Sequence, residues 1–304
     1  MPIYLIVLVT LAVASLVAPT FRQPVNLVNV LVQSVALGLA GTAQTFAILA
    51  GDVDLTVGGI ISLATVAAAK AMADTPQSMF LVSALILLGG GVLGLINGFI
   101  ISRVKVESMI ITLAINAALF GVALHFMPYP SGMVPYRFMT AVTGQVGGVP
   151  LPVLGWGIIV VASWYVLNRT RFGVHLRAVG ADPEVAFRAG IKVERVKMAA
   201  HTATGLLAAL AGLFLAARMG SGDATAGGTF GLDSMTATIA GGANFSSGVG
   251  NVTGTAAGAF LIVVLGNIFN QMGISTYYQT LFKGALLVMA VAGGAIRKRW
   301  QEKK

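Results

Sequence analysis

The side chains that could carry out chemistry are few and scattered in this sequence. It has no cysteine, and its histidines, His125, His175 and His201, form no HExxH motif or close cluster. We therefore expect no disulfide, no thiolate chemistry and no metal site. The nearest match to a P-loop, GDATAGGT at 222–229, has Gly228 where the motif requires lysine. We expect the chain not to be an enzyme, because it lacks an ATPase motif of its own and no nucleophile–base pair can be identified.

Charge is concentrated in one stretch of an otherwise apolar chain. Residues 169–197 hold ten of the 29 charged residues. The whole chain is 57% hydrophobic and 10% charged, with a mean hydropathy of +0.88, whereas soluble domains average about 25% charged residues. This composition predicts an integral membrane protein, and the alternating strands of a membrane β-barrel are absent. We attribute the net charge of +9 to lysines and arginines that orient the loops of a membrane protein, and not to a nucleic-acid site.

Ten segments have the length and apolarity of spanning helices, which need about 20 residues. They run near 3–19, 27–50, 55–73, 79–102, 108–128, 151–168, 198–218, 233–249, 252–271 and 278–296. Glycine and polar residues interrupt the second, and the eighth is short and polar, which indicates a broken or re-entrant helix. We interpret the first as a retained helix because it lacks the basic start of a signal peptide. The predicted fold is an all-α membrane protein with about ten transmembrane helices in one domain, 1–304.

The positions of the basic residues orient these spans. Residues 103–105, 169–197 and 297–304 together carry 14 of the 19 lysines and arginines, whereas the loop at 129–150 carries only Arg137. Cytoplasmic loops are enriched in lysine and arginine. With ten spans, both termini and the charged stretch are expected in the cytoplasm, in a multi-pass protein of the inner (cytoplasmic) membrane.

Spans two to five and seven to ten have features of two copies of one unit. Glycines recur at four-residue steps in both units, at Gly90, Gly94 and Gly98 and at Gly250, Gly254 and Gly258. Such steps let helix backbones approach closely, and transporters often contain inverted repeats. The same steps also arise without duplication in glycine-rich helices, so both interpretations stay open.

The segment DPEVAFRAG predicts a short helix within the charged stretch. Asp182 is placed as its N-cap and Pro183 as its first residue, and Gly190 is placed to end it. Glu184 and Arg188 are four apart and can pair. Two turns of helix are not stable alone in water. The segment is therefore either a solvated loop that fixes topology or a docking helix for a cytoplasmic partner.

Several stretches resemble the ATP-binding-cassette (ABC) permeases of the ribose/arabinose/xylose class. They are the charged stretch 169–197, AGDVDLTVGGI (50–60), GLINGFIISRVKVESMIITLA (94–114), GLLAALAGLFLAARMGSG (205–222) and STYYQTLFKGALLVMAV (275–291). The chain departs from that family at Asp52, an extra carboxylate where glycine is usual, and at Ala243-Asn244, where Thr-Ser is common. Branched-chain amino-acid permeases share the broader architecture.

The resemblance implies the permease subunit of an importer for a sugar or sugar-like solute. It implies a second permease copy or paralogue, an external solute-binding protein, and cytoplasmic ATPases that bind ATP and Mg, with no cofactor in this chain. The docking residues that it implies are Asp182, Pro183, Glu184, Arg188, Ala189 and Gly190. The alternative is an ion-coupled secondary transporter, for which the carboxylates available are Asp52, Asp54 and Asp233. These lie near span ends, which favours the ABC permease. The cargo itself, among pentoses, hexoses, sugar alcohols, nucleosides and furanone-like signals, is not set by the sequence.

A path for a hydroxyl-rich solute needs neutral donors and acceptors, and intramembrane polar groups usually face the bundle interior. For each candidate the alternative is an interhelical hydrogen bond worth about 0.6–2 kcal/mol. For Asp54 we favour the role of capping the helix that begins LTVGG. The candidate path residues are Gln44, Thr45, Asp54, Asn97, Thr112, Asn116, Asn244, Asn267, Asn270 and Gln271.

Overall fold

The computed structural model describes residues 2–74, 76–104, 106–244 and 247–302. Three of the basic residues used above to orient the chain, Lys105, Lys303 and Lys304, lie outside these ranges. In order, the helices are α1 (Pro2–Val17), η1 (Pro19–Arg22), α2 (Pro24–Leu49), α3 (Thr56–Asp74), η2 (Pro76–Ser78), α4 (Met79–Arg103), α5 (Ser108–Phe126), α6 (Tyr136–Thr143), α7 (Leu151–Arg169), α8 (Arg171–Ala181), α9 (Pro183–Arg188), α10 (Val193–Met219), α11 (Phe230–Ala240), α12 (Val252–Gln271) and α13 (Thr276–Glu302). A two-stranded antiparallel hairpin joins α6 to α7, with β1 (Gln145–Val146) paired to β2 (Val149–Pro150).

The prediction of an all-α membrane protein is confirmed, but the structure supports fewer spanning helices than ten. Among the described residues, seven helices are long and apolar enough to cross a bilayer: α2, α3, α4, α5, α7, α10 and α12. The apolar part of α1 is Ile3–Val17, and α11 has 11 residues, whereas spanning helices need at least about 17. The glycine and polar residues within the second predicted span do not break it, because α2 is one helix from Pro24 to Leu49.

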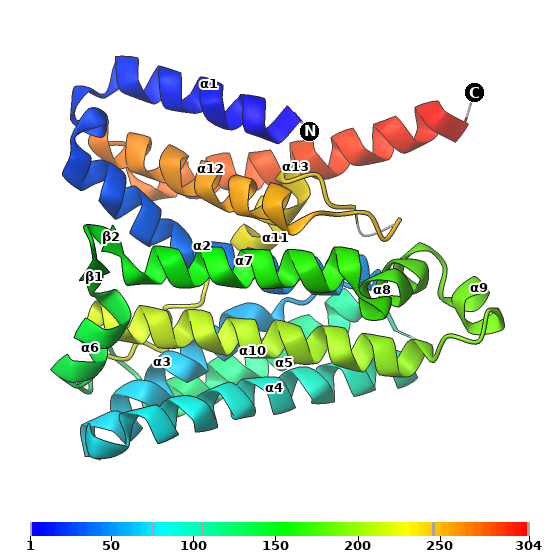
Figure 1. Cartoon of the computed structure of the whole chain (residues 1–304), viewed down its shortest axis with the longest axis horizontal. Helices are drawn as coiled ribbons and strands as arrows, with labels where there is room; N and C mark the ends of the chain where they lie inside the picture. Colours follow the sequence, from blue (N-terminus) through cyan, green and yellow to red (C-terminus); the bar gives the residue numbers. More distant parts are fainter. Residues whose placement is uncertain (1, 75, 105, 245–246, 303–304) are drawn as a thin grey trace.

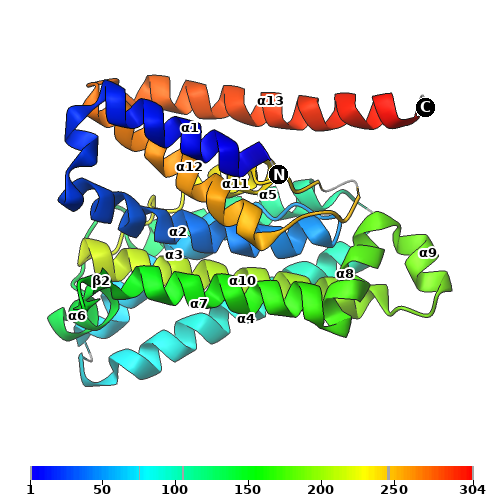
Figure 2. The same cartoon turned by 45° about the horizontal axis from the view of Figure 1, so that its top comes forward.

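The long helices run roughly side by side, as Figure 1 shows. The short helices α8 and α9 lie at one end of the bundle, called here the α9 end, and α6 with the hairpin lies at the opposite α6 end (Figures 1 and 2). Helix α10 has a central position, because it packs against α2, α3 and α4. In Figure 2, α13 lies along the side of the bundle that α11 and α12 form.

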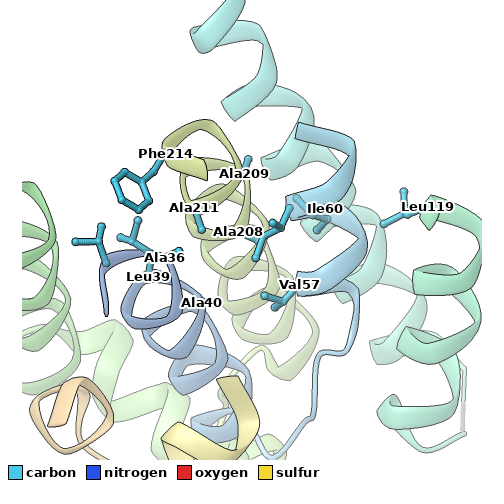
Figure 3. Close-up of a cluster of buried hydrophobic side chains, with 12 residues drawn as sticks. Ala36, Leu39, Ala40, Val57, Ile60, Leu119, Ala208, Ala209, Ala211 and Phe214 are labelled. Atoms are coloured by element: carbon cyan, nitrogen blue, oxygen red, sulfur yellow. The ribbon is translucent and has the colours of Figure 1, made fainter. Parts of the chain in front are cut away.

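Small residues bring the central helices close together. A buried cluster joins α2, α3, α5 and α10, and much of it is alanine, including Ala36, Ala40, Ala208 and Ala211 (Figure 3). Larger residues fill the gaps that the alanines leave, Phe214 among them. Such packing suits helices in lipid, where close backbone approach replaces a hydrophobic driving force.

The predicted glycine faces are contact surfaces in the structure. A methyl group at Gly94 would overlap the carbonyl oxygen of His201, and one at Gly98 would lie 2.6 Å from the Cα of Met198. The glycines at four-residue steps in α4 therefore allow α10 to pack closely against it. In α12, a methyl group at Gly258 would overlap the carbonyl oxygen of Ala237 on α11. Both sets of glycines thus allow a helix to pack closely on its neighbour.

Two non-helical segments enter the bundle. Residues 50–55 join α2 to α3 at the α9 end, and residues 220–229 join α10 to α11. The second segment runs beside α3, where the backbone N–H of Gly227 donates to Ser62 Oγ at 2.9 Å. Figure 1 shows α11 near the middle of the bundle's length. The predicted span near 233–249 thus contains only the 11-residue α11, and a re-entrant course through the membrane stays a prediction.

Candidate functional site: a projecting helix above a buried polar network

Helix α9 has the ends that its sequence predicts. The Asp182 carboxylate accepts hydrogen bonds from the backbone N–H groups of Glu184 and Val185, at 2.8 and 3.0 Å, and Pro183 is the first helical residue. The side chains of Arg188 and Glu184 form an ion pair. Both are largely exposed, so this pair adds little stability. The cap and the proline are what set the start of the helix.

The C-terminal end of α9 turns the chain back into the bundle. Gly190 adopts φ +84, and its N–H donates to the carbonyl of Phe187 at 2.9 Å, while the N–H of Ile191 donates to Ala186 at 3.0 Å. This is the Schellman arrangement, which favours glycine because the left-handed conformation is strained for other residues. The buried Ala186 side chain packs in a cluster with Leu176 and other residues of the bundle. A two-turn helix is therefore held by its neighbours.

The outer face of α9 projects away from the rest of the bundle, as Figures 1 and 2 show. Two apolar side chains on it are exposed, Val185 at 62% and Phe187 at 70%. Sequence reasoning singled out the charges of this helix and missed these two residues. Every residue predicted for docking is exposed, namely Asp182, Pro183, Glu184, Arg188, Ala189 and Gly190.

Below α9, charged residues meet inside the protein. Lys197 and His201 lie one turn apart on α10. Lys197 Nζ is 2.7 Å from Asp52 Oδ1, and His201 Nε2 is 3.4 Å from Asp52 Oδ2. His201 Nδ1 is 2.9 Å from Asp54 Oδ2. His201, Asp52 and Asp54 are buried. The first turns of α10 are thus joined by ion pairs to residues 50–55.

The environment of Asp52 favours its charged form. Burial raises the pKa of this carboxyl, but hydrogen bonds and charges from His201 and Lys197 outweigh burial, so the pKa lies below its ordinary value. The sequence showed Asp52 as an extra carboxylate without a partner. No local spacing motif links it to His201, which is 149 residues away.

Asp54 has the capping role that the sequence favoured. Its Oδ1 accepts a hydrogen bond from the backbone N–H of Thr56 at 2.9 Å, and the Thr56 hydroxyl also donates to it. Both contacts lie at the first residue of α3, where the helix dipole favours an anion. Asp54 differs from a simple cap because its second oxygen contacts His201.

Three of the predicted path residues surround this segment. Asn97 Nδ2 donates to Thr56 Oγ1 at 2.8 Å, and Thr112 Oγ1 donates to the carbonyl of Val53 at 3.2 Å. With its amide nitrogen turned toward the Asp54 carbonyl, Gln44 donates to that oxygen at 2.9 Å. Helices α2, α4, α5 and α10 therefore all bind residues 50–56. We call this set of contacts the polar network.

The other predicted path residues lie apart from the polar network. Thr45 Oγ1 is 2.8 Å from Thr255 Oγ1, Asn116 Oδ1 accepts from the N–H of Gly59 at 2.8 Å, and Asn244 forms an isolated β-bridge with Val249. At the α6 end, three amides continue the series. Asn267 bonds to Asn26 and Gln271, and Asn270 accepts from Gln279. The structure thus distributes these residues among several helix contacts, and their place along a solute path stays a prediction.

A repeated pattern escaped the sequence reasoning. DLTVGG at 54–59 and DATAGG at 223–228 share the form D-x-T-x-G-G. In each, the threonine N–H donates to the aspartate two residues earlier, at 2.9 and 2.7 Å, and the threonine hydroxyl donates to the same oxygen. The two copies touch, because a methyl group at Gly58 or Gly227 would lie against the carbonyl oxygen of the other. The second copy was considered only as a failed P-loop.

Comparison with known proteins places these features in a family. Residues 26–291 match a family model described as the permease component of branched-chain amino acid transport systems. The ribose import permease protein of Haemophilus influenzae is 33% identical over 293 residues, which cover 95% of this chain and 90% of that protein. That of Bacillus subtilis is 34% identical, with 92% and 87% covered. The galactose/methyl galactoside import permease protein of Escherichia coli is 32% identical, with 95% and 92% covered. Because the family model matches most of the chain, the protein belongs to this family of transport-system permeases.

Proposed function

We propose that this protein is the membrane-spanning permease subunit of an ABC importer for a sugar or sugar-like polar solute. The observation that carries the proposal is similarity to sugar import permeases over more than nine tenths of the chain. The names of those relatives include ribose and galactose, so the proposal stops at the class of solute. ATP and Mg are bound by a partner ATPase in this account, and the chain needs no cofactor of its own.

The partner ATPase docks on α9. Support comes from the shape and chemistry of that helix, which presents exposed Val185 and Phe187 between charged residues and projects from the bundle. Exposed apolar side chains flanked by charged residues suit a cleft in a partner protein. Helix α10 follows α9 directly and carries Lys197 and His201. A displacement of α9 therefore passes through the ion pairs of the polar network to residues 50–55.

The chain crosses the membrane ten times with the α9 end in the cytoplasm. The seven long helices supply seven crossings, α1 and α13 supply the first and last, and residues 220–229 with α11 together supply the eighth. Tyr4 near the start of α1 bonds to Thr253 near the start of α12 at 2.9 Å, which is consistent with parallel crossings. Both termini are then cytoplasmic, and the membrane is the inner one. The coupling loop 169–197 is part of a single permease domain, 1–304.

The segments α2–α5 and α10–α13 form an inverted repeat. In this repeat α2, α3, α4 and α5 correspond to α10, α11, α12 and α13. The packing of α4 on α10 then corresponds to that of α12 on α2. In the same way, α3 on α10 corresponds to α11 on α2, and α3 on α5 corresponds to α11 on α13. The two D-x-T-x-G-G stretches occupy corresponding positions and meet at Gly58 and Gly227. Paired glycine-interrupted segments of this kind mark the repeat interface in transporters.

Assembly requires other components. A second permease, either a copy or a paralogue, completes the pore, and an external protein delivers the solute. The lipid bilayer surrounds the rest of the permease surface, as the broad exposed apolar faces of α1, α4 and α5 indicate. Nucleic acid has no part in this account.

Complex formation tests the proposal. The purified cytoplasmic ATPase of the same transport system is added to the detergent-solubilised protein, and the mixture is examined by size-exclusion chromatography. We expect co-elution for the natural chain and its loss for Ala189→Glu, with Val146→Glu on β1 as the control at the other end. An ion-coupled transporter would bind no ATPase, so absence of the complex for the natural chain would refute the proposal.

A further inference from the structure

The non-helical segment 220–229 runs deep beside α3, which is one of the candidate membrane spans. Gly222 lies against Ala69, and Gly227 lies against Gly58. Ala69 and Gly58 are 11 positions apart in the helix, which is about 16 Å at about 1.5 Å per residue. This is about half of the roughly 30 Å hydrocarbon core. The segment is therefore irregular backbone at membrane depth.

Protein covers only one side of this segment. Thr225, Gly228 and Thr229 are exposed, although Gly222 and Gly227 are buried. Irregular backbone exposed to lipid does not occur in the hydrocarbon region, because its N–H and C=O groups have no partners there. It is tolerated where it borders protein or a water-filled cavity. The exposed side of 225–229 must therefore face one of these.

A charged pair lies next to the segment. Lys283 Nζ on α13 is 2.9 Å from Asp233 Oδ2 in the first turn of α11, and their side chains are 33% and 13% exposed. A lone charge at the centre of a bilayer costs about 2.5–3.5 kcal/mol on insertion scales. Charges within membrane-spanning segments usually face a bundle interior or water. The pair, like the irregular backbone, therefore indicates that this side of the segment faces protein or water.

Other surfaces of the molecule contrast with this one. A hollow of about 300 Å³ between α3, α4 and α10 is lined by apolar side chains and glycines such as Leu63, Leu85 and Gly89. It suits no hydroxyl-rich solute. The outer face of α4 is likewise apolar, with Leu85 and Leu88 exposed at 58% and 62%, as expected of a lipid-facing helix.

We propose that one surface of the protein lines a water-filled path and binds a neutral polyhydroxyl solute. This surface, called here the 225–233 face, consists of Thr225, Gly228, Thr229, Asp233 and Lys283. The Thr229 hydroxyl can both donate to and accept from solute hydroxyls, whereas the Thr225 hydroxyl, which donates to Asp223, can accept from them. The Lys283–Asp233 pair supplies polar atoms without net charge, which suits a neutral molecule better than an ion. The inference rests on the proposed function and adds to it the surface that the solute meets.

The absence of cysteine from the chain permits a direct test. Thr225→Cys, Thr229→Cys and the control Leu85→Cys are each assembled with the ATPase and reconstituted, then treated with a charged, membrane-impermeant thiol reagent. We expect the two threonine positions to react at least tenfold faster than position 85, and saturating transported sugar to slow them several-fold. Reaction at neither threonine position, or equal reaction at position 85, would overturn the proposal.

Transport kinetics give a second readout. We expect Thr229→Val to raise the KM for sugar several-fold with the amount of protein in the membrane unchanged, and Thr229→Ser to retain the natural KM. An unchanged KM in Thr229→Val would contradict solute contact at this position. ATP-driven uptake by the unsubstituted transporter is measured in the same vesicles. Uptake without labelling at 225 and 229 would reject this face alone, whereas absence of ATP-driven uptake would reject the proposed function itself.

Discussion

Individual buried polar side chains join α10 to residues 50–55. Lys197 and His201 contact Asp52 and Asp54 over 2.7–3.4 Å. Removing one partner of a buried pair leaves the other charge without compensation, which costs more than the pair contributes. We therefore expect substitution of one partner in the polar network to lower the stability of the protein more than substitution of both partners together.

A double-substitution cycle tests this sensitivity. We expect Lys197→Met to destabilise the folded protein by about 3 kcal/mol, because Asp52 then stays buried with fewer partners. The double variant Asp52→Asn/Lys197→Met should lose less than the sum of the two single losses. Thermal unfolding in detergent measures the stability of the single and double variants. Arg103→Met is the control, because its pair with Glu194 is exposed and should change stability by less than about 1 kcal/mol. Additive losses would show that the pair is not coupled.

Asn97 and Asn267 distinguish a path role from a packing role. From the sequence, changing either to Leu is predicted to lower uptake without lowering expression. The structure gives both side chains interhelical hydrogen bonds, so we expect each substitution also to cost about 0.6–1.7 kcal/mol of stability. Uptake per folded molecule and the unfolding midpoint are measured together. Normal uptake with a lowered midpoint would remove both residues from the path.

Sequence reasoning at this scale succeeded where the signal was local. The cap of α9 at Asp182 and the cap of α3 at Asp54 each depend on residues within three positions, and both are present. His201 was regarded as isolated because its partners are about 150 positions away. Only the fold brings α10 beside residues 50–55, so no spacing rule could have joined them.

Helix α9 is the element on which we propose that the partner ATPase docks. Its inner side is fixed by Ala186 and its outer side exposes Phe187. We expect Phe187→Glu and Arg188→Glu to leave the protein inserted and the ATPase active, with ATP-driven uptake lowered at least tenfold. Uptake and phosphate release are measured in the same proteoliposomes. Val146→Glu, an exposed position on β1, is the control, and normal uptake by both α9 variants would refute the docking assignment.

The contact between α4 and α10 tests the glycine face. A methyl group at Gly94 would overlap the carbonyl oxygen of His201, whereas one at Gly89 would meet nothing within 4 Å. We expect Gly94→Ala to lower the unfolding midpoint clearly, because the two helices must separate. Gly89→Ala, in the same helix, should not lower it, since alanine is intrinsically the better helix former. Equal midpoints for the two variants would show that the close approach is not needed.

At the scale of the whole molecule, hydropathy identified the helical membrane fold but not its construction. It counted ten apolar segments, whereas seven of the described helices are both long and apolar enough to cross a bilayer. The other three predicted spans correspond to α1, to α13 and to residues 220–240, where an irregular segment and the 11-residue α11 replace a long helix. Averaged apolarity cannot distinguish these. The D-x-T-x-G-G repeat was readable at 54–59 and 223–228, and its significance became visible only when the two copies were found in contact.

The most direct measurement of the account is solute uptake into proteoliposomes that contain this permease, with its ATPase and external binding protein supplied or withheld. Labelled ribose and galactose are tested first. We predict that accumulation requires ATP and the ATPase, and persists when ion gradients are collapsed. Accumulation driven by an ion gradient in vesicles that lack the ATPase would contradict the account.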